Sequence, residues 1–204
     1  MDERSQEFRD NLLRQVSVGD YLTDLQSHHP ETYEHSLRVA LLCIDMGFES
    51  ELSGSDLRTL GFSGLLHDLG KTAIDEGILS KASSLEASER HAIDEHPRRG
   101  FVRLEENLYD KVRKVVVGHH EYNRAAFPRQ GGDRRSSGRD GAERRNPDAA
   151  IETMTQIVAV ADMCDALASA RSYKKPFTKD QIRATLTDQF TGDPLYLERA
   201  LDRL

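Results

Sequence analysis

The sequence contains no tryptophan, only two cysteines and no long uninterrupted hydrophobic run. About 18 consecutive apolar residues are needed for a helix that crosses a bilayer, so we expect no membrane span. The first ten residues, MDERSQEFRD, are charged and lack the apolar region of a secretion signal, which predicts a cytoplasmic protein. Cys43 and Cys164 each lie in an apolar stretch of helical character, and we interpret them as buried free thiols.

The composition is polar for a folded protein, with 37% hydrophobic and 31% charged residues among 204. Apolar residues nevertheless recur along the chain, which predicts one packed core. The formal net charge of −7 argues against nucleic acid as a partner, because proteins that bind its backbone present positive charge. Many of the carboxylates lie beside histidines, where a bound metal ion would reverse the local field.

Helical periodicity dominates the chain. Residues 3–26 predict one amphipathic helix. Pro30 opens a second helix that ends near Gly47, because proline at the first helical position gives up no needed donor. A third helix begins at Ser55 and is expected to stop at Gly70. Further helical segments are expected at 74–79, 85–95, 98–106, 109–120, 151–170, after Thr178 and at 194–204.

These segments predict an all-α fold, with a helical extension at 1–27 and a domain at 28–204. Within the domain, residues 129–148 contain almost no apolar side chain and many Arg, Gly and Ser, which predicts a flexible loop. The apolar positions of the extension are compatible with packing on the domain, with a homodimer or with a separate sensor chain. No sensor domain fits before residue 28, so we expect any input signal to come from another chain or a ligand.

Metal-binding side chains are spread over several of the predicted helices. Divalent metals bind carboxylate oxygens and imidazole nitrogens, and a site that activates water needs such ligands to converge. The candidate ligands are Glu31, His35, His67, Asp68, His96, His119, His120 and Asp162. A single histidine on a helix is more often a surface residue than a ligand, so the set as a whole predicts the site.

The dyad His67-Asp68 is the most informative pair. It follows the apolar residues Leu65 and Leu66, where a charged side chain is costly without a partner. Adjacent residues of a helix point about 100° apart, so both can face one metal region only at a helix end. The two oxygens of Asp68 could then bridge two cations.

Four motifs follow one another in the chain: HDLGK at 67–71, His96, HHE at 119–121 and ADMCDALASARSYK from 161. In this order they resemble the HD superfamily of metal-dependent phosphohydrolases. Within that superfamily the chain is similar to the HD-GYP subgroup, which hydrolyses the bacterial second messenger cyclic di-GMP. The resemblance covers about residues 28–190 and implies an HD-domain helical bundle.

The resemblance implies roles for the candidate residues. It implies two or three divalent transition-metal ions on the eight ligands named above, iron or manganese first, with nickel, cobalt or zinc as the remaining candidates. Glu31 matches the extra carboxylate of members with three metals. Asp68 and Lys71 would be catalytic, with a metal-bridging hydroxide as the nucleophile, and Lys71, Arg171 and Lys174 would bind the substrate phosphates.

The chain departs from the subgroup's pattern after the HHE motif. The subgroup has two glycines and a Tyr-Pro pair there, whereas this chain has EYNRAAFP, with Phe127 before Pro128. Glycine permits backbone conformations that Ala125 and Ala126 resist, so this loop must follow a different path. The departure leaves the predicted metal ligands intact, but it leaves open which phosphate compound is the substrate.

Three hypotheses therefore stand. The first is a phosphodiesterase for cyclic di-GMP or a related cyclic nucleotide. The second is an HD-type nucleotide phosphohydrolase with another substrate, which would not need Arg171 and Lys174. The third is a catalytically silent module that keeps the scaffold for signalling or partner binding. Metal content and a phosphodiesterase screen distinguish the three.

Overall fold

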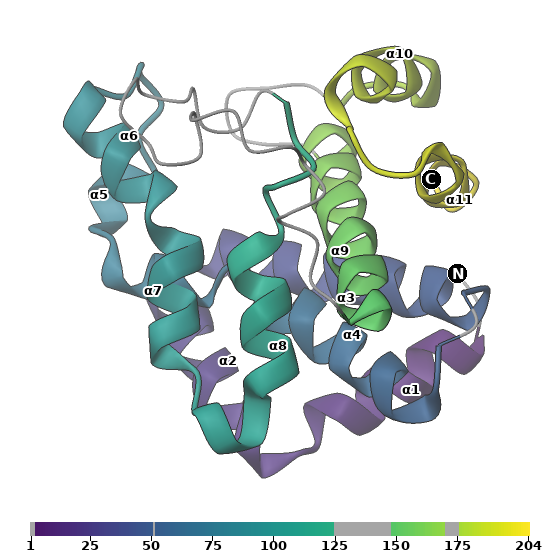
Figure 1. Ribbon diagram of the computed structural model, residues 1–204. Coiled ribbons are helices and arrows are strands. Elements are labelled where there is room, and N and C mark those ends of the chain that lie inside the picture. The colour runs from purple at the N-terminus through teal and green to yellow at the C-terminus, as the bar shows by residue number, and fades with distance from the viewer. Residues whose placement is uncertain (1–2, 51, 125–147, 170–175) are drawn as a thin grey trace.

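The computed structural model describes residues 3–50, 52–124, 148–169 and 176–204, and it confirms the all-α fold (Figure 1). In the described ranges the only β-type pairing is an isolated antiparallel bridge between Asn123 and Phe190. The helices are α1 (Glu3–Leu13), α2 (Val16–His28), α3 (Pro30–Phe48), α4 (Gly54–Leu66), the 3-10 helix η1 (Leu69–Ala73), α5 (Glu76–Leu79), α6 (Ala87–Asp94), α7 (His96–Arg103), α8 (Glu106–Gly118), α9 (Ala149–Ala168), α10 (Lys179–Gln189) and α11 (Pro194–Leu201).

The N-terminal segment forms two helices, so the prediction of one helix over 3–26 was wrong (purple in Figure 1). The break lies at Gln15, whose backbone is extended. In one continuous helix Leu12 and Val18 would point about 120° apart. The break lets both side chains enter the same core cluster, where they pack with Ala40 and Leu65. The extension is therefore packed on the domain through buried apolar side chains.

Helix α3 lies at the centre of the fold and packs against both α4 and α9. Pro30 occupies its first turn as predicted, and the His29 side chain accepts a hydrogen bond from the backbone N–H of Thr32. One face of α3 contributes Val39 and Met46 to a core shared with α9 and the C-terminal helices. Since α3 has core contacts on both sides, the position of its polar residues is firmly set.

Helix α4 ends at Leu66, not at Gly70, which lies within η1. The reason for glycine at this position is a close approach rather than a helix stop. A Cβ atom on Gly70 would lie 1.9 Å from the carbonyl oxygen of His96 and 2.6 Å from the amide nitrogen of Gly100. The two glycines thus let α7 pack directly against the backbone of η1.

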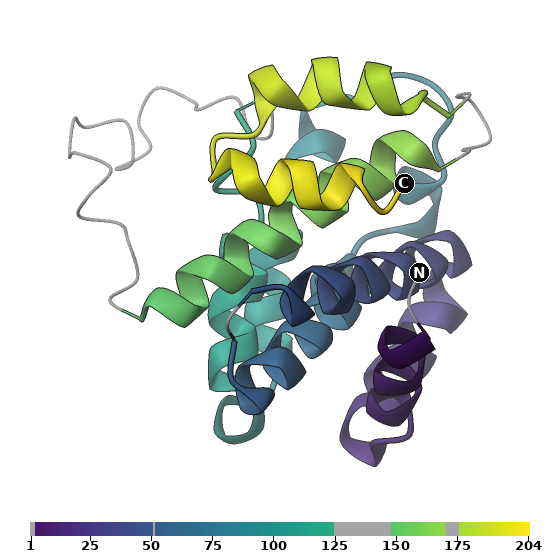
Figure 2. The ribbon, with the colours of Figure 1, turned by 90° about the vertical axis from the view of Figure 1, so that its right-hand side faces the viewer.

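The valine-rich segment is a helix, as expected, although α8 begins earlier than predicted and is kinked at Tyr109. The prediction at 98–106 was wrong at its C-terminal end, because α7 stops at Arg103. Thr178 and Gln181 form a capping box at the start of α10, the helix expected after Thr178. Figure 2 shows α10 and α11 side by side, packed over α9.

The segment after the HHE motif is tied to the α10–α11 connection. The backbone N–H of Arg124 donates to Gln189, and that of Thr191 donates to Tyr122. The predicted loop at 129–148 lies outside the described residues except for Asp148, which caps α9. None of the helices in the described ranges is both long and apolar enough to cross a membrane.

Candidate metal centre

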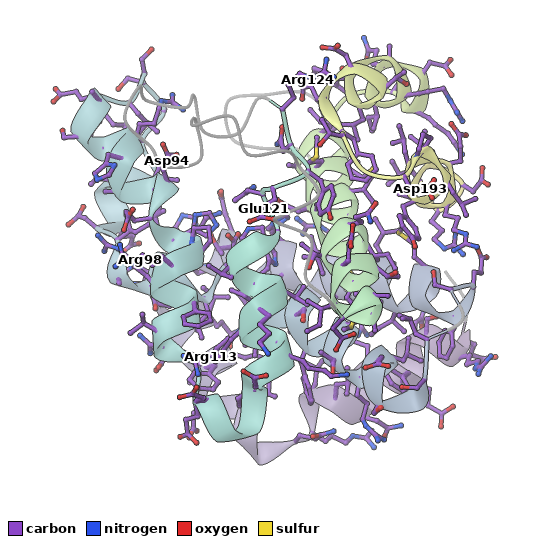
Figure 3. All side chains as sticks on the ribbon, in the orientation of Figure 1. Asp94, Arg98, Arg113, Glu121, Arg124 and Asp193 are labelled. Atoms are coloured by element: carbon purple, nitrogen blue, oxygen red, sulfur yellow. The ribbon has the colours of Figure 1, made fainter. Side chains whose placement is uncertain are left out.

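Five helical segments bring the metal-binding side chains together, and seven of the eight predicted ligands belong to groups that could hold an ion. Within each group the ligand atoms lie within 4.8 Å of one another. The three groups are His35, His67 and Asp162; His67, Asp68 and His119; and His96, His119 and His120. Glu121, labelled in Figure 3, lies where the end of α8 approaches α9 and directly follows His120 in the chain.

Asp68 lies between the outer groups, and its two oxygens face different neighbours. Oδ1 is 3.2 Å from Nε2 of His96. Oδ2 is 3.4 Å from Nε2 of His67 and 3.8 Å from Nε2 of His35. Burial alone raises the pKa of Asp68, but the charge of Lys71, followed by the influence of the neighbouring histidines, outweighs it and holds the pKa well below its usual value. The carboxylate is therefore ionised and placed to bridge.

The histidine end of the site consists of His96, His119 and His120. Nε2 of His96 is 3.3 Å from Nε2 of His119 and 3.3 Å from Nε2 of His120. Nδ1 of His96 lies 2.7 Å from the carbonyl of Ile93, and Nδ1 of His119 lies 2.6 Å from that of Val116. A carbonyl only accepts, so both Nδ1 atoms carry the ring proton, and in the neutral rings both Nε2 atoms present lone pairs.

These rings stay neutral because they are buried. Burial lowers the pKa of His96 to about 3, and burial is also the largest cause of the lowered pKa of His119. Two lone pairs that face each other at 3.3 Å repel unless a cation lies between or beside them. The histidine end therefore fits a metal ion.

His67 gives a second observation in favour of a metal. Its Nδ1 lies 2.9 Å from the carbonyl of Gly64 and so donates, which leaves Nε2 as an acceptor. Nε2 is buried, and among the described residues it makes no hydrogen bond. A buried polar atom of this kind needs a partner. A divalent ion between His67 and the neighbouring carboxylates would satisfy it.

The carboxylate end of the site consists of His35 and the two carboxylates Asp162 and Asp165, and it is held together by hydrogen bonds. Nε2 of His35 donates to Asp162 at 3.0 Å, and Nδ1 donates to Asp165 at 2.7 Å. Burial lowers the pKa of His35, but the two hydrogen bonds outweigh it and raise the pKa to about 9. Arg38 donates twice to Asp165, at 2.8 and 3.0 Å. Without a metal, this end is thus balanced by a proton on His35.

Asp165 and Arg38 also belong to the site, although neither was among the predicted site residues. Each lies three residues after a predicted ligand: Asp165 after Asp162 on α9, and Arg38 after His35 on α3. Residues three apart share a helix face, so this spacing is the signal that points both side chains towards the α3–α9 contact.

The remaining predicted residues have different outcomes. Lys71 lies in the site, with Nζ 2.7 Å from Oδ2 of Asp68. Glu31 is exposed and belongs to none of the three groups found among the described residues. Arg171 and Lys174 lie outside the described residues. Asp162 is ionised, since hydrogen bonding and the charge of His35 outweigh burial and lower its pKa.

A match to the HD domain runs over residues 32–167 and includes every residue of the three metal-binding groups. The chain belongs to the HD domain family. This HD domain is 32% identical over 186 residues to the 3′3′-cGAMP-specific phosphodiesterase 2 of Vibrio cholerae, covering 87% of the chain and 32% of that protein. It is 31% identical over 193 residues to the cyclic di-GMP phosphodiesterase response regulator RpfG of Xanthomonas campestris, covering 93% of the chain and 46% of RpfG.

The HD domain of the phosphodiesterase PgpH from L. monocytogenes, in complex with cyclic-di-AMP, has the same fold. The TM-score is 0.58 at 19% identity, over 89% of this chain and 92% of that one. The curated relatives confirm the resemblance inferred from the sequence motifs. This HD domain spans about a third of the length of one of those relatives and a little under half of the other.

Proposed function

We propose that this HD domain hydrolyses a phosphodiester bond of a cyclic dinucleotide with two divalent metal ions. The observation that carries the proposal is the position of Asp68, whose two oxygens face two separate groups of ligands. The names of the curated relatives and the cyclic-di-AMP complex of the PgpH domain support a cyclic dinucleotide as the substrate class.

One ion would be held by His35, His67 and Asp162, and the other by His96, His119 and His120. Asp68 would bridge them. Mixed imidazole and carboxylate ligands suit iron or manganese, which we propose as the resident metals. When bound, such ions supply positive charge to the phosphate and acidify water.

Lys71 has a role of its own in this scheme. Its ammonium group is half-buried and contacts Asp68, which places a positive charge at the edge of the metal-binding groups. A phosphodiester carries negative charge on its non-bridging oxygens, and that charge grows as the reaction proceeds. We infer that Lys71 turns from Asp68 to a non-bridging oxygen and stabilises this charge. Arg171 and Lys174 are proposed as further phosphate ligands on the basis of the sequence motif alone.

The test is a substrate screen on metal-loaded protein. Protein reconstituted with Mn²⁺ or Fe²⁺ is incubated with cyclic di-GMP, 3′3′-cGAMP, cyclic-di-AMP and a set of nucleoside monophosphates, and the products are separated by chromatography. We expect linear dinucleotide or mononucleotide products from at least one cyclic dinucleotide, and none with Asp68→Asn. The matched control is His91→Gln, which removes an exposed histidine of α6 and should leave turnover unchanged.

The other outcomes identify the competing hypotheses. Release of phosphate from monophosphates alone would replace the proposal with a nucleotidase. A protein that binds less than one equivalent of metal and turns over nothing would be a silent module, and the proposal would be wrong.

A further inference from the structure

Three histidines of the site are oriented by their own helices. Nδ1 of His67, His96 and His119 each donates to the backbone carbonyl three residues earlier, at 2.9, 2.7 and 2.6 Å. These carbonyls lie in the last turns of α4, α6 and α8, where the regular pattern of backbone hydrogen bonds in the helix ends. Each ring is thus fixed by a local contact.

His35 has no such carbonyl, because it lies in the body of α3 rather than at its end. There the carbonyl of Thr32 accepts from the N–H of Ser36 in the regular helical pattern. The partner of Nδ1 comes instead from α9: Oδ2 of Asp165, 2.7 Å away. His35 is the one ring of these four that depends on a charged side chain of another helix.

Asp165 is itself held in place. Nε and Nη2 of Arg38 donate to its two oxygens, at 2.8 and 3.0 Å. Arg38 and His35 are three residues apart on α3, so two side chains of the same helix donate hydrogen bonds to the carboxylate of Asp165. The side chain of Asp165 is 10% exposed, whereas that of Arg38 is 47% exposed. The arginine thus carries the compensating charge out to solvent.

We propose that Asp165, held by Arg38, is a positioning residue that fixes His35 as a metal ligand. This inference rests on the proposed metal-dependent function. Asp165 keeps the ring proton on Nδ1 and directs Nε2 towards the ion held with His67 and Asp162. A carboxylate partner also makes the imidazole a stronger donor to a cation than a carbonyl partner does.

The experiment measures each ion separately. Zn²⁺ is titrated calorimetrically into the full chain, in a background with His120→Gln to disable the histidine end or with Asp162→Asn to disable the carboxylate end. In the His120→Gln background, Asp165→Ala should weaken binding by roughly 10- to 100-fold, the range found for outer partners of metal-bound histidines. In the Asp162→Asn background, Asp165→Ala should change the Zn²⁺ affinity by no more than about twofold, far less than the loss expected in the His120→Gln background.

A ring-proton signal separates positioning from a general structural role. In the Zn²⁺-loaded protein, ¹⁵N-edited NMR should show the four Nδ1 protons protected by their hydrogen bonds. Asp165→Ala should remove the protected signal of His35 alone and leave those of His67, His96 and His119. Asp165→Asn, whose amide oxygen still accepts the proton, should restore the signal but only part of the affinity, because the charge is missing. Arg38→Gln, a milder change at a half-exposed residue, should give the smallest loss.

The matched control is Glu198→Gln. It removes a carboxylate that pairs with Arg183 between α10 and α11, away from the metal-binding groups, and should change neither readout. Unchanged Zn²⁺ affinity and an unchanged His35 signal in Asp165→Ala would overturn the inference while the proposed function stands. Equal weakening in both backgrounds would also overturn it, since that is the mark of general destabilisation. A wild-type chain that binds no metal would instead remove the proposed function.

Discussion

The carboxylate end and the histidine end of the site prepare for a cation in opposite ways. At the carboxylate end, His35 lies between Asp162 and Asp165, and its pKa is raised to about 9. At the histidine end, burial lowers the pKa of His96 to about 3, and three imidazole rings face one another beside Asp68. One end holds a proton where the metal would bind, and the other holds lone pairs that repel.

The difference means that metal binding has a different driving force at each end. At the carboxylate end the ion must displace the proton of His35, so its apparent affinity rises with pH. At the histidine end the ligands are already deprotonated at neutral pH, and the ion relieves repulsion between buried nitrogens. Asp68 joins the two ends through separate oxygens. Variants that change one end at a time test this difference.

Replacing the shared residue should have the largest effect. Asp68→Ala removes the carboxylate common to both ends, so both ions and all turnover should be lost. The loss of activity should exceed the roughly 10- to 100-fold that is typical of residues outside the ligand shell. Elemental analysis together with the substrate screen measures it. Activity that survives this change would show that the centre is elsewhere.

Gly70→Ala should remove the histidine end selectively. The new Cβ would lie 1.9 Å from the carbonyl oxygen of His96, a clash that no side-chain movement can relieve. Helix α7 must shift, which we expect to cost about 3 kcal/mol of folding free energy. Urea unfolding and metal analysis should show lower stability and the loss of one ion.

Gly19→Ala is the control for this change, because nothing lies within 4 Å of its added Cβ. Because Gly19 lies in a helix, Gly19→Ala should raise the free energy of unfolding by up to about 1 kcal/mol. If Gly70→Ala kept two ions and wild-type stability, α7 would not be positioned by the glycine contact.

The two ends should also give the metal-free protein opposite pH dependences. For His96 the folded-state pKa of about 3 lies below the ordinary 6.5, so the unfolded chain binds more protons in that window, and stability should rise as pH increases from 5 to 6.5. For His35 the pKa is raised from 6.5 to about 9, so its stabilisation is complete below 6.5 and lost as pH rises through 9.

Urea unfolding from pH 5 to 9 measures the free energy of unfolding on the acid limb, where stability rises with pH, and on the alkaline limb, where it falls. His96→Gln should reduce the slope of the acid limb, to which His119 and His120 also contribute, and His35→Gln should flatten the alkaline limb. The exposed His91→Gln should alter neither. A single limb that both site variants change equally would contradict the division of the site into two ends.

The smallest effect is expected from Glu31→Gln. Glu31 is exposed and lies outside the groups that the described residues form, so both ions and most of the activity should remain. Metal analysis of the wild-type and variant chains is the measurement. A third equivalent that disappears with Glu31 would establish the three-metal arrangement implied by the sequence resemblance.

Much of the site was predictable because its ligands lie in short motifs whose order is distinctive. The helical periodicity likewise predicted α3 and α9, which are long and rich in buried apolar residues. The break at Gln15 was not predictable, since it depends on which neighbours Leu12 and Val18 meet in the core. The role of Asp165 was not predictable for a related reason. Its partner His35 is 130 residues away in the chain, and only the packing of α3 on α9 brings the two together.

The contact between Gly70 and Gly100 has a consequence for how such sequences can diverge. A side chain at position 70 would collide with the backbone of α7 and not with one of its side chains. No compensating substitution on α7 can therefore make room for a larger residue. A descendant that changed Gly70 would have to move His96 away from Asp68. Loss of this glycine in a lineage should therefore be accompanied by loss of the histidine end.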